Sequence, residues 1–161
     1  IIVLLRNPVE RALSQYAMER ERGHEKRPLL ISLLAEWWRF RAKPDDYRAL
    51  LRVKPGRRFC YLERGCYLSQ VRRYQKLFPP ENLLLLTSDQ LWHEHEQTLE
   101  RIYDFLGVND RNWLPPRARV FATPVAGGRP GVWSRRLLRL FYRREIRRLE
   151  QHLGWDLSPW R

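Results

Sequence analysis

Apolar side chains occur along this chain in two short unbroken runs and five longer periodic stretches. The unbroken runs, residues 1–5 (IIVLL) and 83–86 (LLLL, within the expected strand 82–87), lack the alternation of a half-exposed strand. Such runs are typical of strands buried on both faces in a parallel sheet. In the longer stretches apolar residues recur every three to four positions, which predicts amphipathic helices. These helices are expected over residues 8–22, 29–42, 67–78, 98–106 and 133–153.

The first helix has a start signal directly after the first strand. Asn7 can cap the helix, Pro8 fits its first position, and Glu10 can close a capping box. Ser14 falls opposite the core-facing stripe, and its hydroxyl is expected to point back toward Arg6 at the strand end. The core-facing stripe consists of Val9, Ala12, Leu13, Tyr16 and Ala17.

Arg6 and Ser14 thus flank a strand end and a helix N-terminus, the place where α/β folds bind anions. Two interpretations stay open on this pattern alone. In the first, the guanidinium and the hydroxyl hold an anion. In the second, Arg6 pairs with a protein carboxylate and Ser14 is an ordinary surface serine.

Turn and stop signals divide the rest of the chain. Gly23 is expected to end the first helix, residues 79–80 (both proline) the third, and Gly107 the fourth. Residues 88–89 open a short turn or helix after the second strand. Residues 37–38, both tryptophan, are expected to pack in the core with a partly exposed ring, and sugar stacking is the alternative.

Composition favours a folded, basic domain. The 161 residues are 43% hydrophobic, with 7 Trp and 6 Phe, which argues against disorder and allows one domain with a real core. No apolar run approaches the length of a membrane span, and no signal peptide is visible. A net charge of +13 favours a polyanionic partner: nucleic acid, an acidic membrane, or an anionic cofactor and glycan. A solvated face is the alternative for the arginines that line the last helix, Arg136, Arg139, Arg143 and Arg147.

The cysteines and histidines predict no metal centre. Cys60 and Cys66 are too few for a zinc site or a disulfide framework; two free thiols are expected, and a bridge between them is the alternative. His93 and His95 are two residues apart and do not share a helix face. No histidine is placed by a known motif to activate Ser14 as a nucleophile.

Three segments, RNPVERALSQY, YLERGCYLSQVRRYQKLFPPENLLLLTSDQL and YDFLGV, follow one another in a specific order and spacing. From residue 1 to about 108 this succession resembles sulfotransferases that use 3′-phosphoadenosine 5′-phosphosulfate (PAPS), particularly the bacterial and heparan-sulfate-type branch. GWDLSPW, near the C-terminus, is similar to the end of family members. The resemblance implies that Arg6 and Ser14 grip the 3′-phosphate of the nucleotide.

The resemblance implies an α/β fold class: part of a helix-rich, P-loop-kinase-like three-layer fold with a parallel sheet flanked by helices. It implies a transferase that moves a sulfuryl group from PAPS to a hydroxyl or amine of an acceptor, with a glycan favoured. The product nucleotide is then 3′-phosphoadenosine 5′-phosphate, and the chemistry needs no metal. This chain is expected to carry the 3′-phosphate half of the cofactor site.

A glycine-containing basic loop closes over the nucleotide in the family, and GGRPG stands in the corresponding region here. This implies Arg129 as a further phosphate contact, and the backbone N–H groups of Gly127 and Gly128 could line an anion nest. An ordinary exposed loop is the alternative interpretation.

Two parts of the family's machinery are missing from the sequence. In the family, a lysine-bearing loop for the 5′-phosphosulfate and a Glu or His base precede the segment that carries Arg6 and Ser14. We therefore expect residues 1–161 to be a single sulfotransferase domain, incomplete at its N-terminus, with no catalytic residue in this chain and no turnover alone. The acceptor and the compartment (cytoplasm in a bacterium, Golgi lumen in a eukaryote) stay undetermined.

Two other functions stay open. A basic nucleic-acid-binding module would use the C-terminal arginines and bind any duplex with a steep salt dependence. A P-loop kinase relative would share the strand-then-helix arrangement but would select ATP and depend on Mg²⁺. For the sulfotransferase no nucleic acid is expected as a partner.

Overall fold

The computed structural model describes residues 1–42, 59–108, 115–116 and 132–161. The chain divides into two compact units. The sheet unit comprises Ile1–Asn7 and Ser69–Ala122, and the helical unit comprises Pro8–Leu68 and Thr123–Arg161. The expectation of one domain over residues 1–161 stays a prediction.

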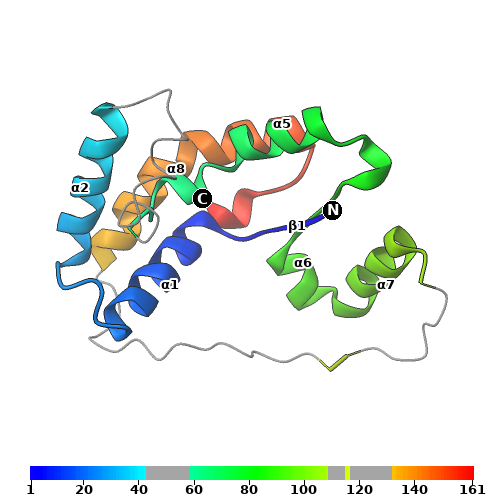
Figure 1. Cartoon of the computed structure of the whole chain (residues 1–161), viewed down its shortest axis with the longest axis horizontal. Helices are drawn as coiled ribbons and strands as arrows, with labels where there is room; N and C mark the ends of the chain where they lie inside the picture. The colour runs from blue at the N-terminus through cyan, green and yellow to red at the C-terminus, as the bar shows by residue number, and fades with distance from the viewer. Residues whose placement is uncertain (43–58, 109–114, 117–131) are drawn as a thin grey trace. The chain divides into compact units, whose positions relative to one another are not determined.

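The sheet unit is built on two parallel strands, β1 (Ile2–Leu5) and β2 (Leu84–Thr87), which pair in register from end to end (Figure 1). The ladder continues one residue further, because the Leu84 N–H donates to the carbonyl of Ile1 at 2.9 Å. The N-terminal ammonium donates to the carbonyl of Asn82 at 2.6 Å. The predicted parallel pairing of the two apolar runs is therefore confirmed.

Burial on both faces is wrong for β1 in the described part of the chain. Leu5 is buried, but the side chains of Ile2 and Leu4 are 39% and 49% exposed. These two residues lie on the same side of the strand, because side chains alternate along it. Among the described residues β2 is the only strand that pairs with β1. The outer side of β1 is therefore left partly exposed by the described residues.

Helices flank β2 along the chain in the sheet unit. α5 (Tyr67–Leu77) begins in the helical unit and ends just before the prolines, as predicted, and a 3₁₀ turn (Pro80–Asn82) leads into the strand. α6 (Ser88–His93) follows at once, and Thr87 and Gln90 form a reciprocal capping box at its start.

α7 (His95–Leu106) begins three residues earlier than expected and ends at Gly107, whose φ of +67° confirms the predicted stop. Thr98 and Leu99 are buried on its inner side. Leu106, expected to face inward, is 57% exposed, because it is the last helical residue before the chain turns away.

The described residues of the helical unit include three long helices, α1 (Pro8–Glu21), α2 (Leu29–Ala42) and α8 (Val132–Leu153). They also include two 3₁₀ turns, η1 (Glu63–Gly65) before α5 and η3 (Ser158–Trp160) after α8. α1 packs against both α8 and η1 (Figure 1). Pro8 is the first residue of α1 and Gly23 adopts a φ of +72° after it, so both predicted boundary signals are confirmed.

The predicted stripes of α1 and α8 form a large part of the described core of this unit. Four of the five predicted residues of α1 are buried and Tyr16 is half-buried. Phe141, expected inside, is 39% exposed because it lies at the edge of the stripe, with its ring against that of Tyr142 at 5.0 Å. The buried side chains of the α8 stripe are Leu138, Tyr142, Ile146 and Leu149.

α2 buries Leu29 and Leu33 but exposes much of its remaining apolar surface. Trp37 is 37% exposed and Trp38 is 69% exposed, with the two rings edge to face at 6.0 Å. Core packing is therefore wrong for Trp38 in the described part of the chain. The 3.6-residue period predicted the helix. Leu and Trp residues lie on several of its sides, however, so the pattern did not indicate which side is buried.

No helix in the described ranges combines the length and the apolar character that crossing a membrane requires.

Candidate anion-binding site

Arg6 and Asn7 form the whole connection between β1 and α1. The parallel strands point their carboxyl ends at this connection, and α1 begins directly after it. In α/β folds, anions bind where a parallel strand ends and the N-terminus of the next helix begins. Arg6 is exposed and adds a full positive charge there.

Ser14 lies two turns into α1 and is half-buried. Its hydroxyl has no hydrogen bond with any residue in the described ranges, so its donor capacity is not used by the protein there. Arg6 belongs to the sheet unit and Ser14 to the helical unit. The predicted convergence of the two side chains on one anion therefore stays a prediction.

Arg129, together with Gly127 and Gly128, lies outside the described residues. Its predicted contact with a phosphate stays a prediction.

Glu10 links the first turn of α1 to α8. Its carboxylate accepts a hydrogen bond from the Arg135 guanidinium, and both side chains are 40% exposed. An ion pair this exposed contributes little to stability.

Arg11 is a cation of α1 that the sequence analysis did not single out. Its guanidinium donates to the Gln15 side chain at 2.8 Å and to the Tyr61 carbonyl beside η1. Its Nε–H is buried and has no partner among the described residues. Arg11 precedes Ser14 by three positions, which places both on neighbouring parts of the helix surface. This three-residue spacing from Ser14 is the feature of the sequence that points to Arg11.

A buried carboxylate of α2 fixes the segment that leads into η1. Three consecutive backbone N–H groups, those of Tyr61, Leu62 and Glu63, donate to Glu36 at 2.6, 2.8 and 2.9 Å. The Tyr142 hydroxyl lies 2.9 Å from the carbonyls of both Tyr61 and Leu62. The segment that Arg11 contacts is thereby held from α2 and α8 at once.

A second buried carboxylate, Glu25, lies at the turn between α1 and α2. Burial alone would raise its pKa, but hydrogen bonds from the Arg27 side chain and backbone at 3.0 Å outweigh this and lower it. The Tyr61 hydroxyl donates to the same carboxylate at 3.2 Å. Burial, followed by the nearby charge of Glu25, raises the pKa of Tyr61. This tyrosine therefore stays a neutral donor.

The two cysteines are free thiols, as expected. Burial raises the pKa of Cys60 and of Cys66 to about 12, and nearby carboxylates add to the effect. Thiols with so high a pKa stay protonated at neutral pH and are poor nucleophiles.

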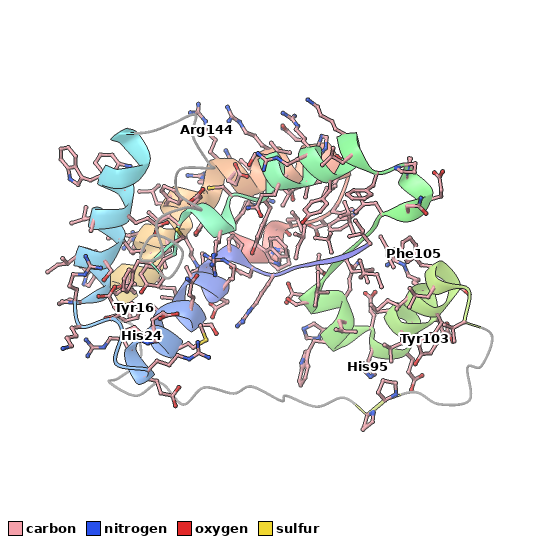
Figure 2. All side chains as sticks on the ribbon, in the orientation of Figure 1. Tyr16, His24, His95, Tyr103, Phe105 and Arg144 are labelled. Carbon is pink, nitrogen blue, oxygen red and sulfur yellow. The ribbon has the colours of Figure 1, made fainter. Side chains whose placement is uncertain are left out.

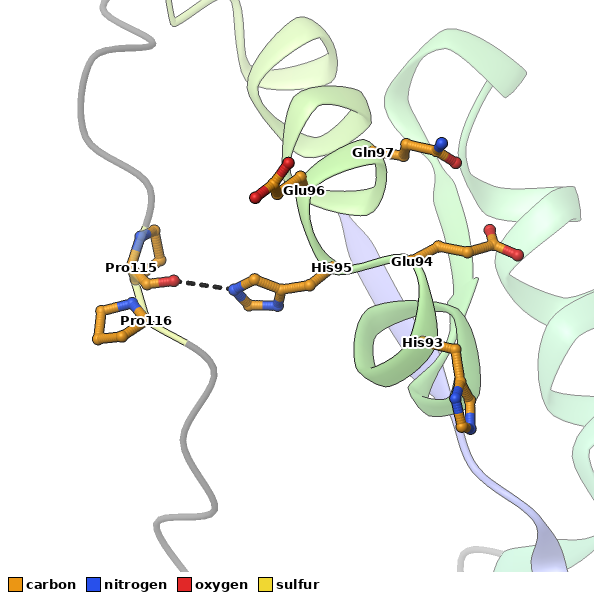
Figure 3. Close-up of a pocket in the computed structure, with 7 residues that line it drawn as sticks. All are labelled: His93, Glu94, His95, Glu96, Gln97, Pro115 and Pro116. Atoms are coloured by element: carbon orange, nitrogen blue, oxygen red, sulfur yellow. Dashed lines mark hydrogen bonds between the residues drawn. The ribbon is translucent and has the colours of Figure 1, made fainter.

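The histidines of the sheet unit line a pocket with Pro115 and Pro116 (Figure 3). One ring nitrogen of His95 lies 2.8 Å from the Pro115 carbonyl and the other 3.2 Å from that of Leu91. Both nitrogens therefore lie within hydrogen-bond distance of carbonyl oxygens of the protein. Within the described ranges no three His, Cys, Asp or Glu side chains are grouped to hold one.

The predicted arginine face of α8 is present. All four of its arginines are exposed. Figure 2 shows their neighbour Arg144 projecting away from the helix. This exposure agrees with either a solvated face or a binding surface.

Comparison with known proteins identifies related chains. The family model described as the sulfotransferase domain matches residues 1–114. Among solved structures, a sulfotransferase from Alicyclobacillus acidocaldarius is similar over 99% of this chain, with a TM-score of 0.74 and 26% sequence identity. The chain spans 56% of that protein's length. A search of curated proteins found no match.

Proposed function

The chain belongs to the sulfotransferase domain family, and on this premise we propose that it serves the transfer of a sulfuryl group from PAPS to a hydroxyl or amine. The observation that carries the proposal is the two-residue connection at Arg6 and Asn7, which joins a parallel strand to the N-terminus of α1. With the family match, this connection supports an anionic ligand at the strand end. The helix-rich α/β fold agrees with the similar bacterial structure.

In this proposal Arg6 and Ser14 bind the 3′-phosphate of the cofactor. A guanidinium presents parallel N–H donors that match a phosphate, and a hydroxyl offers one more donor. The exposed position of Arg6 and the unused hydroxyl of Ser14 fit this role. Arg129 is proposed as a third contact, from the sequence that follows α7.

When bound, PAPS supplies the sulfuryl group and the phosphate that leaves with it. The residues of this chain contribute by holding the nucleotide, so that the donor stays in line with an acceptor oxygen or nitrogen. The family places its base and its phosphosulfate-binding lysine before the segment that carries Arg6. Neither role is therefore assigned to a residue of this chain.

A glycan is the proposed acceptor class. The resemblance to the heparan-sulfate-type branch supports it, and so does the net charge of +13, which suits an anionic polysaccharide. The positive charge also supports the alternative of a nucleic-acid-binding module, so the test has to include both.

A thermal-shift comparison of three ligands separates the candidate functions. We expect 3′-phosphoadenosine 5′-phosphate to raise the unfolding temperature, because a ligand that binds only the native state stabilises it. ATP with Mg²⁺ and duplex DNA should raise it less at equal concentration. A larger shift with ATP and Mg²⁺ would favour a kinase relative, and a salt-sensitive shift with DNA alone would favour a nucleic-acid module.

The importance of the 3′-phosphate is tested by a matched ligand pair. Adenosine 5′-phosphate lacks only that group, so it should bind more weakly than the bisphosphate by isothermal titration calorimetry. Equal dissociation constants for the two ligands would overturn the proposed 3′-phosphate site.

A further inference from the structure

The exposed surface of α8 carries positive charge without any exposed carboxylate. Both glutamates of the helix face protein partners: Glu145 accepts from the Leu68 N–H at 2.9 Å, and Glu150 accepts from the Leu157 N–H at 3.0 Å. The exposed arginines of the helix are Arg136, Arg139, Arg143, Arg144, Arg147 and Arg148. Their charges are therefore not balanced by exposed acids on the same helix.

Apolar side chains run through the first half of this basic surface. Trp133, Leu137 and Leu140 are 71%, 49% and 67% exposed, and their spacing of four and three residues places them in one line along the helix. Together with Arg136, Arg139 and Arg143 they line a groove of about 520 Å³, to which Arg161 also contributes. We call these six residues of the helix the α8 face. An apolar line this exposed costs free energy unless something covers it.

We propose that the α8 face binds an anionic lipid surface, with the helix lying in the plane of the membrane. Trp133, Leu137 and Leu140 would enter the boundary between headgroups and acyl chains, where tryptophan is favoured. The three arginines beside them would meet the lipid phosphates, with their aliphatic stems along the apolar line. Arg144, Arg147 and Arg148 extend the positive surface along the second half of the helix.

Charge and apolar content together favour lipid over other partners. A second copy of the chain would bring the same arginines against one another, which is unfavourable. A nucleic acid or a sulfated glycan would neutralise the arginines and could stack on the tryptophan, but it offers no apolar medium for the two leucines. A lipid surface satisfies both the charge and the apolar line. This inference does not depend on the proposed sulfotransfer.

Vesicle sedimentation tests the inference on the purified full chain. We expect the chain to pellet with vesicles of phosphatidylcholine and phosphatidylserine, but not with phosphatidylcholine alone. Replacing Leu137→Glu and Leu140→Glu together should lower the partition coefficient by about tenfold or more, because two apolar anchors are lost. The matched control is Leu77→Glu with Leu106→Glu, which changes two leucines of similar exposure, 67% and 57%, on other helices. The control should bind vesicles like the unmodified chain.

A second pair of variants tests the charges separately. Arg139→Gln with Arg143→Gln should weaken binding to the anionic vesicles by roughly 30-fold at low salt. The reason is that each arginine near the membrane surface contributes a similar amount to the electrostatic attraction to anionic lipids. Arg72→Gln with Arg101→Gln, two exposed arginines of α5 and α7, serves as the control and should bind normally. Circular dichroism confirms that each variant is folded.

Three results would overturn the inference. The first is the absence of binding to anionic vesicles, and the second is equal binding by the Leu137→Glu, Leu140→Glu variant. The third is binding to heparin or duplex DNA that is lost in the Arg139→Gln, Arg143→Gln variant while no binding to vesicles is seen. That result would assign the α8 face to a soluble polyanion.

Discussion

The hydroxyl of Tyr142 lies directly against Gly65, the last residue of η1. A Cβ at position 65 would lie 2.6 Å from that oxygen and 2.7 Å from two carbons of the ring. The φ angle of Gly65 is not positive. Glycine is therefore required at this position because there is no room for a side chain, and not because of the backbone conformation. The close approach lets the tyrosine reach the carbonyls of Tyr61 and Leu62.

Replacing Gly65→Ala should destabilise the protein by about 1–3 kcal/mol, the usual cost of adding a methyl group to a filled core. Tyr142 is fully buried, so its ring has little freedom to move aside. Urea unfolding measures the change, and Arg64→Ala, at the exposed neighbouring position, is the control. An unchanged unfolding midpoint for Gly65→Ala would show that the Tyr142 ring can move aside without a loss of stability.

Replacing Glu36→Gln should cost about 2–3 kcal/mol of stability. The buried carboxylate accepts three backbone N–H groups, whereas an amide has one oxygen and turns an NH₂ group toward some of these donors. Urea unfolding of the variant is compared with that of Glu21→Gln, an exposed change at the end of α1. Equal stability of the two variants would contradict a role for Glu36 in holding the segment before η1.

Glu25 should make the stability of the folded protein depend on pH in the acid range. Its pKa is lowered in the folded protein, chiefly by Arg27 against the opposing effect of burial, so the unfolded chain binds its proton more readily. The resulting stabilisation is complete above the ordinary value of 4.5 and is lost as the pH falls through the lower folded value. Glu25→Gln should therefore show a smaller decline in urea midpoint below about pH 5 than the unmodified protein.

Glu100→Gln, an exposed change on α7, supplies the comparison for this acid series. It should keep the full decline of the unmodified protein. Parallel curves for Glu25→Gln and the unmodified protein between neutral and acid pH would contradict the role of Glu25.

The boundaries of the elements could be predicted because they depend on neighbouring residues. Pro8 starts α1, the prolines after Leu77 follow the end of α5, and Gly107 ends α7, each through the backbone geometry of one or two residues. The pairing of two apolar runs as parallel strands followed from their composition.

Burial and long-range contacts could not be predicted in the same way. The periodic pattern identifies apolar positions, but it does not say which neighbour covers them, as Leu4 and Trp38 show. Glu36 reads as one polar residue of a helix, and its partners lie 25 or more residues away. Sequence spacing suggested that Arg6 and Ser14 act together, but their mutual distance depends on how two units are placed.

Replacing Ser14→Ala should weaken binding of 3′-phosphoadenosine 5′-phosphate by about 0.5–1.5 kcal/mol, the worth of one ordinary hydrogen bond. The hydroxyl is proposed as a single neutral donor, so the loss should be smaller than that of a charged group. Isothermal titration calorimetry measures it, with Ser69→Ala on the exposed surface of α5 as the control. Equal dissociation constants for both variants would remove Ser14 from the site.

Replacing Arg6→Ala should weaken binding of the same bisphosphate by about 1.5–3 kcal/mol, because a guanidinium forms charge-assisted hydrogen bonds to phosphate. Arg72→Ala, an exposed arginine of α5 in the same unit, removes an equal charge elsewhere. Calorimetry at constant salt separates a specific contact from a general loss of positive charge. We expect the control to bind nearly as the unmodified protein does.

Adenosine 5′-phosphate makes the test of Arg6 specific to the 3′-phosphate. If the guanidinium contacts that group, Arg6→Ala should weaken binding of the bisphosphate much more than binding of the monophosphate, which lacks it. The preference of the protein for the bisphosphate would then shrink in the variant. Equal losses for both ligands would mean that Arg6 acts through the general field of the strand end or through folding. An unchanged dissociation constant for the bisphosphate would exclude Arg6 from the site altogether.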